Sequence, residues 1–313
     1  MSKSKIDFFE SVKTVLKDKQ LSDGSINLYL RNLKKLNDDK VFNNLTFLKK
    51  PNDVLDKIKD LKDNTQRQYL ISIVSTLKAL GDKYKPLYKK YYKLMINLHN
   101  KIKEKPTEEL TETQKKNWIN WNDVLVLYKE MGENLKLNKI KLTEEQYANL
   151  LNFVLLSLYV LIPPRRNLDW QLMIITFNED MSNNKFNYLD YKNKKFIFNN
   201  FKTAKKDGQL IMNIPDELMK ILDIYIKYHP LNKNMKKQPH NIPLLIDYKG
   251  HSFTKINDIT RMLNKIFNKK VGASMLRHSY LSSKYGNLLK EQEKDAKAMS
   301  HNLMTQKDYI KDV

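Results

Sequence analysis

The segment from Leu150 to Asp169 reads LLNFVLLSLYVLIPPRRNLD. As far as Ile162 it is apolar nearly all round a helix, which is typical of a helix buried on every side. With Thr143 as its N-cap, the pattern predicts a single helix from Thr143 to Ile162 at the centre of a domain. The prolines at 163 and 164 end that helix.

The rest of the chain predicts a mainly helical protein with a small sheet. Helical spacing of apolar residues predicts further helices over Lys5–Leu16, 22–36, Pro51–Leu61, 63–80, Pro86–Lys103, Trp121–Met131, Glu217–Tyr228, Phe253–Phe267, Gly272–Tyr285, Leu288–Met299 and Met304–Ile310. β-rich runs predict strands over Met173–Phe177, Phe186–Asp190, Lys195–Phe201 and Gln209–Ile214, the last two joined by a turn at Asp207-Gly208. A small antiparallel sheet on a helical body is the α+β class.

A charged stretch around Pro106 has no apolar periodicity and predicts a break between domains. We expect a helical bundle over residues 1–104, a linker over 105–117 and a second domain over 118–313. A length of 313 residues agrees with two domains.

Composition narrows the function classes. The chain has no cysteine, which excludes a disulfide scaffold, a thiolate zinc site and a cysteine nucleophile. Its longest apolar run, Leu150 to Ile162, is too short for a membrane span of about 20 residues, and the N-terminus has no signal-type stretch, so we expect an intracellular protein without a membrane partner. The net charge of +22 favours a nucleic-acid partner, although an AT-rich coding sequence also enriches lysine.

Arginine is scarce, with 6 residues against 51 lysines, and only arginine offers a planar fork for two phosphate oxygens. Arg165 and Arg166 follow the double proline. Pro164 can occupy the first turn of the next helix, which places both arginines at a helix N-terminus that favours anions. Asp169, three residues after Arg166, is close enough to orient a guanidinium. A plain surface arginine pair is the alternative.

Three later segments carry further candidate residues. Lys202 lies where a strand enters the hairpin turn, with Lys205 and Lys206 as alternatives, and can donate a proton to a leaving alkoxide. The segment Ser274–Tyr280 (SMLRHSY) embeds Arg277 and His278 among apolar residues, where burial calls for an anionic partner. His301 precedes Tyr309 by eight residues near the C-terminus. Taken singly, each segment also fits an ordinary surface or packing role.

Together and in this order, the four segments resemble the tyrosine recombinases, the phage-integrase type of DNA breaking-and-rejoining enzyme. The Pro-Pro-Arg-Arg-x-x-Asp form is similar to that of integrases of large DNA viruses and mobile elements. The helices SINLYLRNL (25–33) and TQRQYL (65–70) look like the core-binding helices of that family. The resemblance implies an N-terminal core-binding domain and a C-terminal catalytic domain that clamp duplex DNA.

The resemblance also implies roles for individual residues. Tyr309 matches the nucleophile, Arg166 and Arg277 the phosphate clamp, and Lys202 the hairpin acid. Ser274 stands where the family usually has a histidine, which leaves open whether His301 or water takes the tyrosine proton. The expected catalytic set is Arg166, Lys202, Ser274, Arg277, His278, His301 and Tyr309. The expected DNA-contacting set is Arg31, Arg67, Arg165, Lys205 and Lys206.

We therefore expect a site-specific recombinase that forms a 3′-phosphotyrosine on double-stranded DNA, as a homo-tetramer on paired DNA sites, without metal or cofactor. It would act in the nucleus or a viral replication compartment of a eukaryotic or viral source, or in the cytoplasm of a bacterium. One alternative is a type IB topoisomerase or telomere resolvase with the same residues. The other is a DNA-binding protein of this fold whose catalytic site has decayed.

Overall fold

The structure is a computed structural model. It describes residues 7–104, 110–137, 141–177, 181, 183–232, 242–255 and 257–310, apart from the side chains at 304, 307 and 308. The chain divides into two compact units, Met1–Glu109 and Leu110–Val313, each with its own hydrophobic core. Among the described residues, no helix combines the length and the apolar composition that crossing a membrane requires.

The first unit is a helical bundle. Its helices are α1 (Phe8–Asp18), α2 (Asp23–Leu36), α3 (Pro51–Ile58), α4 (Asp63–Ala79) and α5 (Lys85–Glu104). Ser22 caps α2 by accepting a hydrogen bond from the Ser25 N–H, as its sequence position predicts. The bundle core includes one buried polar group that has a hydrogen-bond partner. The hydroxyl of the fully buried Tyr91 donates to the carbonyl of Leu48 at 2.9 Å.

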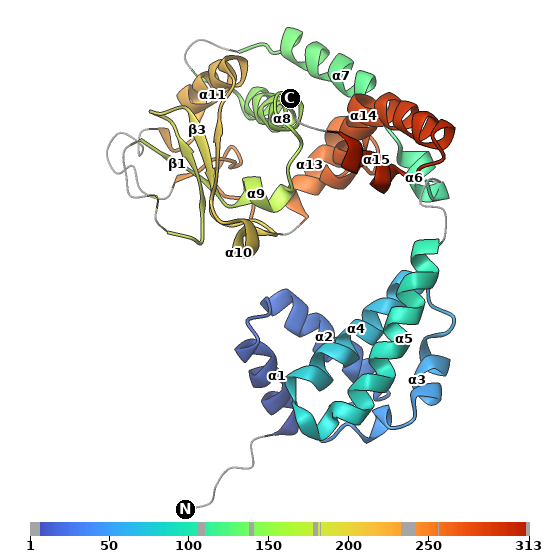
Figure 1. The fold of residues 1–313 in the computed structure, drawn as a ribbon. Coiled ribbons are helices and arrows are strands. Elements are labelled where there is room, and N and C mark those ends of the chain that lie inside the picture. The colour runs from blue at the N-terminus through green and yellow to red at the C-terminus, as the bar shows by residue number, and fades with distance from the viewer. Residues whose placement is uncertain are drawn as a thin grey trace, which may run out of the picture. The chain divides into compact units, whose positions relative to one another are not determined.

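The second unit is built on α8 (Glu144–Val160), the helix predicted from the apolar run. Thr143 caps it in a reciprocal capping box with Gln146. Its packing partners include α7 (Trp121–Glu133), α11 (Asp216–Tyr228) and α13 (Asp258–Phe267), so it is buried nearly all round. Short helices α6 (Glu112–Asn117), α9 (Asn167–Gln171) and α10 (Ala204–Asp207), the long α14 (Ala273–Ala298) and the terminal α15 (Leu303–Tyr309) complete the described helices. Figure 1 shows α8 and α11 beside the sheet.

The sheet has five strands in the order β4-β3-β2-β1-β5. They are β1 (Met173–Thr176), β2 (Asn187–Asp190), β3 (Lys195–Phe198), β4 (Leu210–Asn213) and β5 (Ile242–Pro243). The prediction of a purely antiparallel sheet is wrong, because β1 and β2 run parallel, with Met173 opposite Asn187. Two strands that follow each other in the chain can pair in parallel only if the connection between them leads back to the end of the sheet where β1 begins. The local sequence pattern does not predict this direction. The mainly helical α+β character of the chain is confirmed, with a mixed sheet.

Three element boundaries differ from prediction. The stretch predicted as a linker contains α6, capped by Thr111. The helix expected to begin at Phe253 begins at Asp258, because the carbonyls of Phe253 and Lys255 instead accept hydrogen bonds from the Gln171 side chain. The two helices expected over 272–285 and 288–299 form a single helix, α14, of 26 residues.

Candidate functional site

Arg165 is the most firmly held arginine among the described residues. Its Nε donates to Asp169 Oδ2 at 2.9 Å, and the two side chains are 16% and 3% exposed. The centre of its guanidinium lies 3.7 Å from the centre of the Phe198 ring and 5.6 Å from that of Phe201. The carboxylate uses only the Nε–H, so the terminal nitrogens have no hydrogen-bond partner among the described residues and are left to bind an anion.

This geometry corrects the expectation that Asp169 orients Arg166. Arg166 is the N-cap residue of α9, with extended backbone angles, and Asp169 lies in the first turn of that helix. From there the carboxylate reaches back to the side chain of Arg165, four residues earlier, rather than to that of Arg166. Pro164, expected in the first helical turn, precedes α9 and is buried.

Three of the six arginines share one electrostatic environment. Burial lowers the pKa of the Arg165 guanidinium, and Arg166 and Arg277 lower it further, while Asp169 opposes them. Burial raises the pKa of Asp169, and Arg165 and Arg166 act against that rise. Arg166 and Arg277 are both half-buried. The Asp169 carboxylate therefore faces two guanidinium groups, and Arg277 adds a third positive charge near Arg165, so the excess positive charge favours an anion such as a phosphate.

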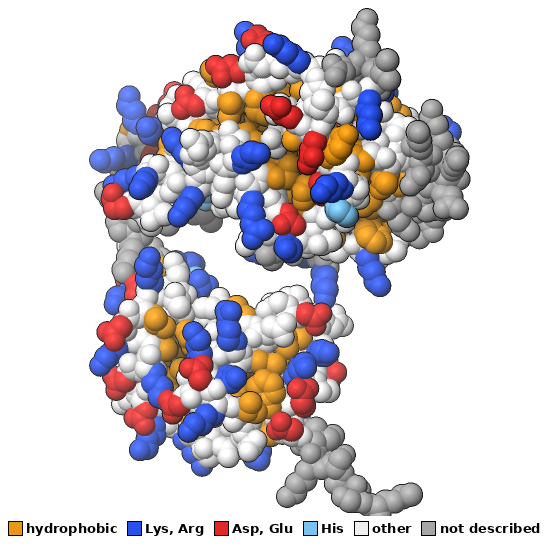
Figure 2. Space-filling view, turned by 180° about the vertical axis from the view of Figure 1, so that it is seen from behind, with side chains coloured by type: hydrophobic (Ala, Val, Ile, Leu, Met, Phe, Trp, Pro, Cys, Tyr) orange, Lys and Arg blue, Asp and Glu red, His pale blue; other side chains and the backbone are white. Residues whose placement is uncertain are grey.

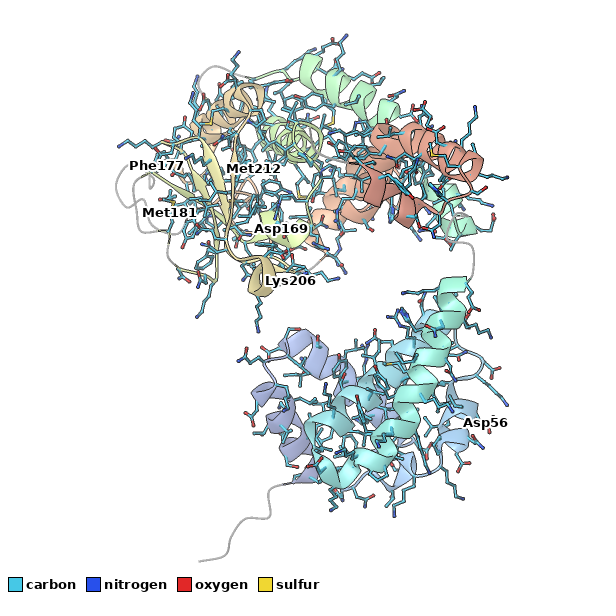
Figure 3. The ribbon with its side chains drawn as sticks, viewed as in Figure 1. Asp56, Asp169, Phe177, Met181, Lys206 and Met212 are labelled. Carbon is cyan, nitrogen blue, oxygen red and sulfur yellow. The ribbon has the colours of Figure 1, made fainter. Side chains whose placement is uncertain are left out.

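The β3–β4 hairpin carries the lysine candidates beside this cluster. Lys202 follows Phe201, the second ring near the Arg165 guanidinium. Lys202, Lys205 and Lys206 are exposed, and Figure 3 labels Lys206 on α10 and Asp169 on α9. The predicted turn is present in a modified form: a single helical turn, α10, followed by Gly208 at a φ of +73°, a conformation that glycine adopts without strain.

An amide network that the sequence analysis missed fixes the base of this hairpin. Asn187, fully buried at the start of β2, donates to the carbonyls of Asp169 and Asn200 at 2.8 and 3.0 Å. Its Oδ1 accepts from the backbone N–H groups of Asn199 and Asn200 at 2.9 and 2.8 Å. Gln209 adds a 2.7 Å bond to the Asn199 side chain. The sequence signal for this network was an asparagine in a strand, with the pair Asn199-Asn200 further along the chain. This signal was hidden because the whole chain is rich in asparagine.

His301 and Tyr309 lie together after the end of α14, Tyr309 as the last residue of α15. Their rings are stacked at 5.1 Å with 6° between the planes, and Tyr309 is 68% exposed. The backbone N–H of His301 donates to the carbonyl of Ala296, in the last turn of α14. Arg277 lies near the first turn of that helix, whose 26 residues correspond to about 39 Å of helical rise. Among the described residues, no hydrogen bond, ion pair or ring contact joins this pair to the three arginines.

The remaining predicted residues are placed as follows. Ser274 and His278 lie in the first turns of α14 and are exposed. In the first unit, Arg31 on α2 is exposed and Arg67 on α4 is half-buried. Arg67 lies close enough to His99 on α5 to add to the burial that lowers the histidine pKa.

The positive charge does not by itself locate a DNA-binding face. Figure 2 shows lysine and arginine side chains scattered over the visible face of both units. Within the described part of the chain, no three histidine, aspartate or glutamate side chains gather as metal ligands would. Comparison with protein-family models, curated proteins and solved structures finds no match to this chain.

Proposed function

We propose that this chain breaks and rejoins DNA through a covalent phosphotyrosine, in the manner of the tyrosine recombinases that its motifs resemble. The observation that carries the proposal is the cluster of Arg165, Arg166 and Arg277. These are half of the arginines in a chain that otherwise uses lysine, and they come from two distant segments. One carboxylate and two aromatic rings hold Arg165 in place. Such a cluster suits the non-bridging oxygens of a phosphate.

In the proposed step the Tyr309 oxygen bonds to the scissile phosphorus, and the bond from phosphorus to the 5′-oxygen breaks. The phenol proton passes to His301, whose ring is stacked on that of Tyr309, or to water. The Lys202 ammonium gives its proton to the 5′-oxygen, which leaves as a hydroxyl. Resealing is the reverse attack by a 5′-hydroxyl and needs no ATP.

The arginines stabilise the charge that builds on the phosphoryl oxygens during this step. The structure changes one assignment within the proposal: Arg165, with its carboxylate and its ring, is the better-positioned clamp residue, and Arg166 adds charge beside it. Among the described residues, no hydrogen bond, ion pair or ring contact joins Tyr309 to the cluster, so the proposal includes DNA binding or a second copy of the chain that brings a tyrosine to the phosphate. A homo-tetramer on paired DNA sites is part of this proposal.

The test is a covalent capture experiment. The protein is incubated with a library of nicked duplexes of randomised sequence, and complexes that survive SDS are isolated and sequenced. We expect wild-type protein and Tyr285→Phe, which alters another exposed tyrosine, to form the adduct and Tyr309→Phe to form none. No adduct with wild type, or an adduct with Tyr309→Phe, would overturn the assignment.

A second candidate function is DNA binding without cleavage. It is favoured by the lack, among the described residues, of any hydrogen bond, ion pair or ring contact between Tyr309 and the three arginines. In that case wild-type protein binds duplex DNA with a strong salt dependence and forms no adduct with any member of the library. A type IB topoisomerase or telomere resolvase is distinguished instead by an adduct without exchange between two marked duplexes.

A further inference from the structure

We propose that Asn187 is a positioning residue, which holds the Lys202 segment against Arg165 so that the lysine can protonate the leaving 5′-oxygen. This inference rests on the proposed function. It concerns a buried amide that the recombinase-like motifs do not include.

The side chain of Asn187 is fully used in hydrogen bonding. Its NH2 group donates twice, to the carbonyls of Asp169 and Asn200, and its oxygen accepts twice, from the N–H groups of Asn199 and Asn200. All four distances lie between 2.8 and 3.0 Å. An asparagine amide has two donor hydrogens and one acceptor oxygen with two lone pairs, so nothing is left unsatisfied.

The partners of Asn187 belong to the two halves of the proposed site. On one side is the backbone of Asp169, whose carboxylate holds the Arg165 guanidinium. On the other side is the backbone of residues 199 and 200, which lead directly into Phe201 and Lys202. A single buried side chain therefore sets the spacing between the segment that carries the clamp and the segment that carries the acid.

Lys202 depends on this support because its own side chain has no hydrogen bond or ion pair among the described residues. Its place is fixed by the backbone that precedes it. That backbone is held from within by Asn187 and from the loop before β4 by Gln209, which donates to the Asn199 side chain at 2.7 Å. The Arg165 guanidinium, packed over the Phe198 ring, is a third contact between the α9 segment and the strand that leads to Lys202.

An asparagine is a costly choice for this position if its only role is to fill the core. Asparagine is disfavoured in strands, and the following residues of β2 include the buried Tyr188 and Leu189. Its four hydrogen bonds instead satisfy one buried and three part-buried backbone groups. Proton transfer needs heavy atoms within hydrogen-bond reach, so a small displacement of Lys202 is enough to slow it.

The test compares two DNA substrates that differ in the leaving atom. One has the ordinary 5′-oxygen at the scissile phosphate, and the other has a bridging 5′-sulfur. A thiol has a pKa near 8.5, so the sulfur departs as a thiolate and needs no proton from a lysine. Both are made on a sequence recovered in the covalent capture experiment, and the rate of adduct formation is measured for each.

We expect Asn187→Ala to slow adduct formation on the oxygen substrate by about 100-fold and on the sulfur substrate by less than about 3-fold. Gln209→Ala, an exposed change on the same loop, should show a smaller defect with the same rescue. Asn193→Ala is the matched control. It removes an asparagine hydrogen-bonded at 2.8 Å to Asp190 in the β2–β3 turn, and it should leave both rates unchanged.

Equal slowing on the two substrates, in Asn187→Ala and in Gln209→Ala, would show that the network only supports the fold and would overturn the inference. Unchanged rates on both substrates would overturn it as well. Failure of the proposed function looks different, because wild-type protein would then form no adduct with either substrate. Thermal unfolding of each variant establishes that it is folded before its rates are compared.

Discussion

The Arg165 guanidinium lies 3.7 Å from the centre of the Phe198 ring while its Nε is held by Asp169. The planar group is thus fixed on one face and along one edge. A lysine ammonium cannot reproduce this arrangement, because it is a point charge without a flat surface or a fork.

Arg165→Lys should therefore lose the clamp while keeping the charge. We expect adduct formation in the covalent capture experiment to fall by about 100-fold, the scale seen when one donor to a developing oxyanion is removed. Arg261→Lys is the control, since Arg261 is 69% exposed on α13 and should be unaffected. An active Arg165→Lys variant would assign the clamp to Arg166 instead.

Asp169→Ala should destabilise the second unit. The change leaves the largely buried guanidinium of Arg165 without its counter-charge, which costs about 3 kcal/mol. Urea unfolding measures the loss in the free energy of unfolding. Glu133→Ala, which removes an exposed 3.8 Å pair with Lys129, should cost less than about 1 kcal/mol. An equal loss of unfolding free energy in the two variants would contradict a buried ion pair between Arg165 and Asp169.

Gly286→Ala tests whether α14 is one helix. Gly286 lies in its middle, and no atom lies within 4 Å of an added Cβ. Alanine is favoured over glycine in a helix by about 1 kcal/mol, so the free energy of unfolding should rise by up to that amount. Gly208→Ala, at a φ of +73° with equally open surroundings, should instead lower it by about 1–3 kcal/mol, because only glycine adopts this backbone conformation readily. A destabilised Gly286→Ala variant would mean that the helix breaks there.

Stability should fall in mild acid because of His229. Burial lowers the pKa of His229 to about 4 from an ordinary value of 6.5. The unfolded chain therefore binds a proton first as pH drops, and stability present above pH 6.5 is lost progressively down to about pH 4. The full loss is about 3 kcal/mol. Urea unfolding at several pH values should show a shallower decline in His229→Gln than in wild-type protein, and an equally steep decline in the two would contradict this account.

The elements that the sequence predicts well are those governed by local pattern. The cap of α8 and its buried residues all lie within one continuous stretch of sequence. In the β3–β4 hairpin, the turn glycine lies close in sequence to the two strands that it connects. The parallel pairing of β1 with β2 depends on how a connection returns, which local pattern does not contain. The continuity of α14 was not predicted: two helices were expected on either side of Gly286, whereas a single glycine costs only about 1 kcal/mol in a helix.

The candidate site shows the same division. Arginine scarcity and local sequence context singled out Arg165, Arg166 and Arg277 one by one, but the effect of Arg166 and Arg277 on the pKa of Arg165 appears only in the folded structure. Which arginine Asp169 holds was predicted wrongly, because spacings of three and four residues are both within reach and the cap geometry of α9 decides between them. The role of Asn187 depends on partners both upstream and downstream of it in the chain, at separations that only the folded structure brings together.

For the proposed reaction, the stacking of Tyr309 on His301 means that the isolated chain would be latent. Among the described residues, no hydrogen bond, ion pair or ring contact joins the hydroxyl that would attack to the arginines that would bind a phosphate. A phosphate bound by the arginines would then not be cleaved. Strand breakage would be confined to assemblies that bring a tyrosine to the bound phosphate, from the same chain or from a neighbouring copy.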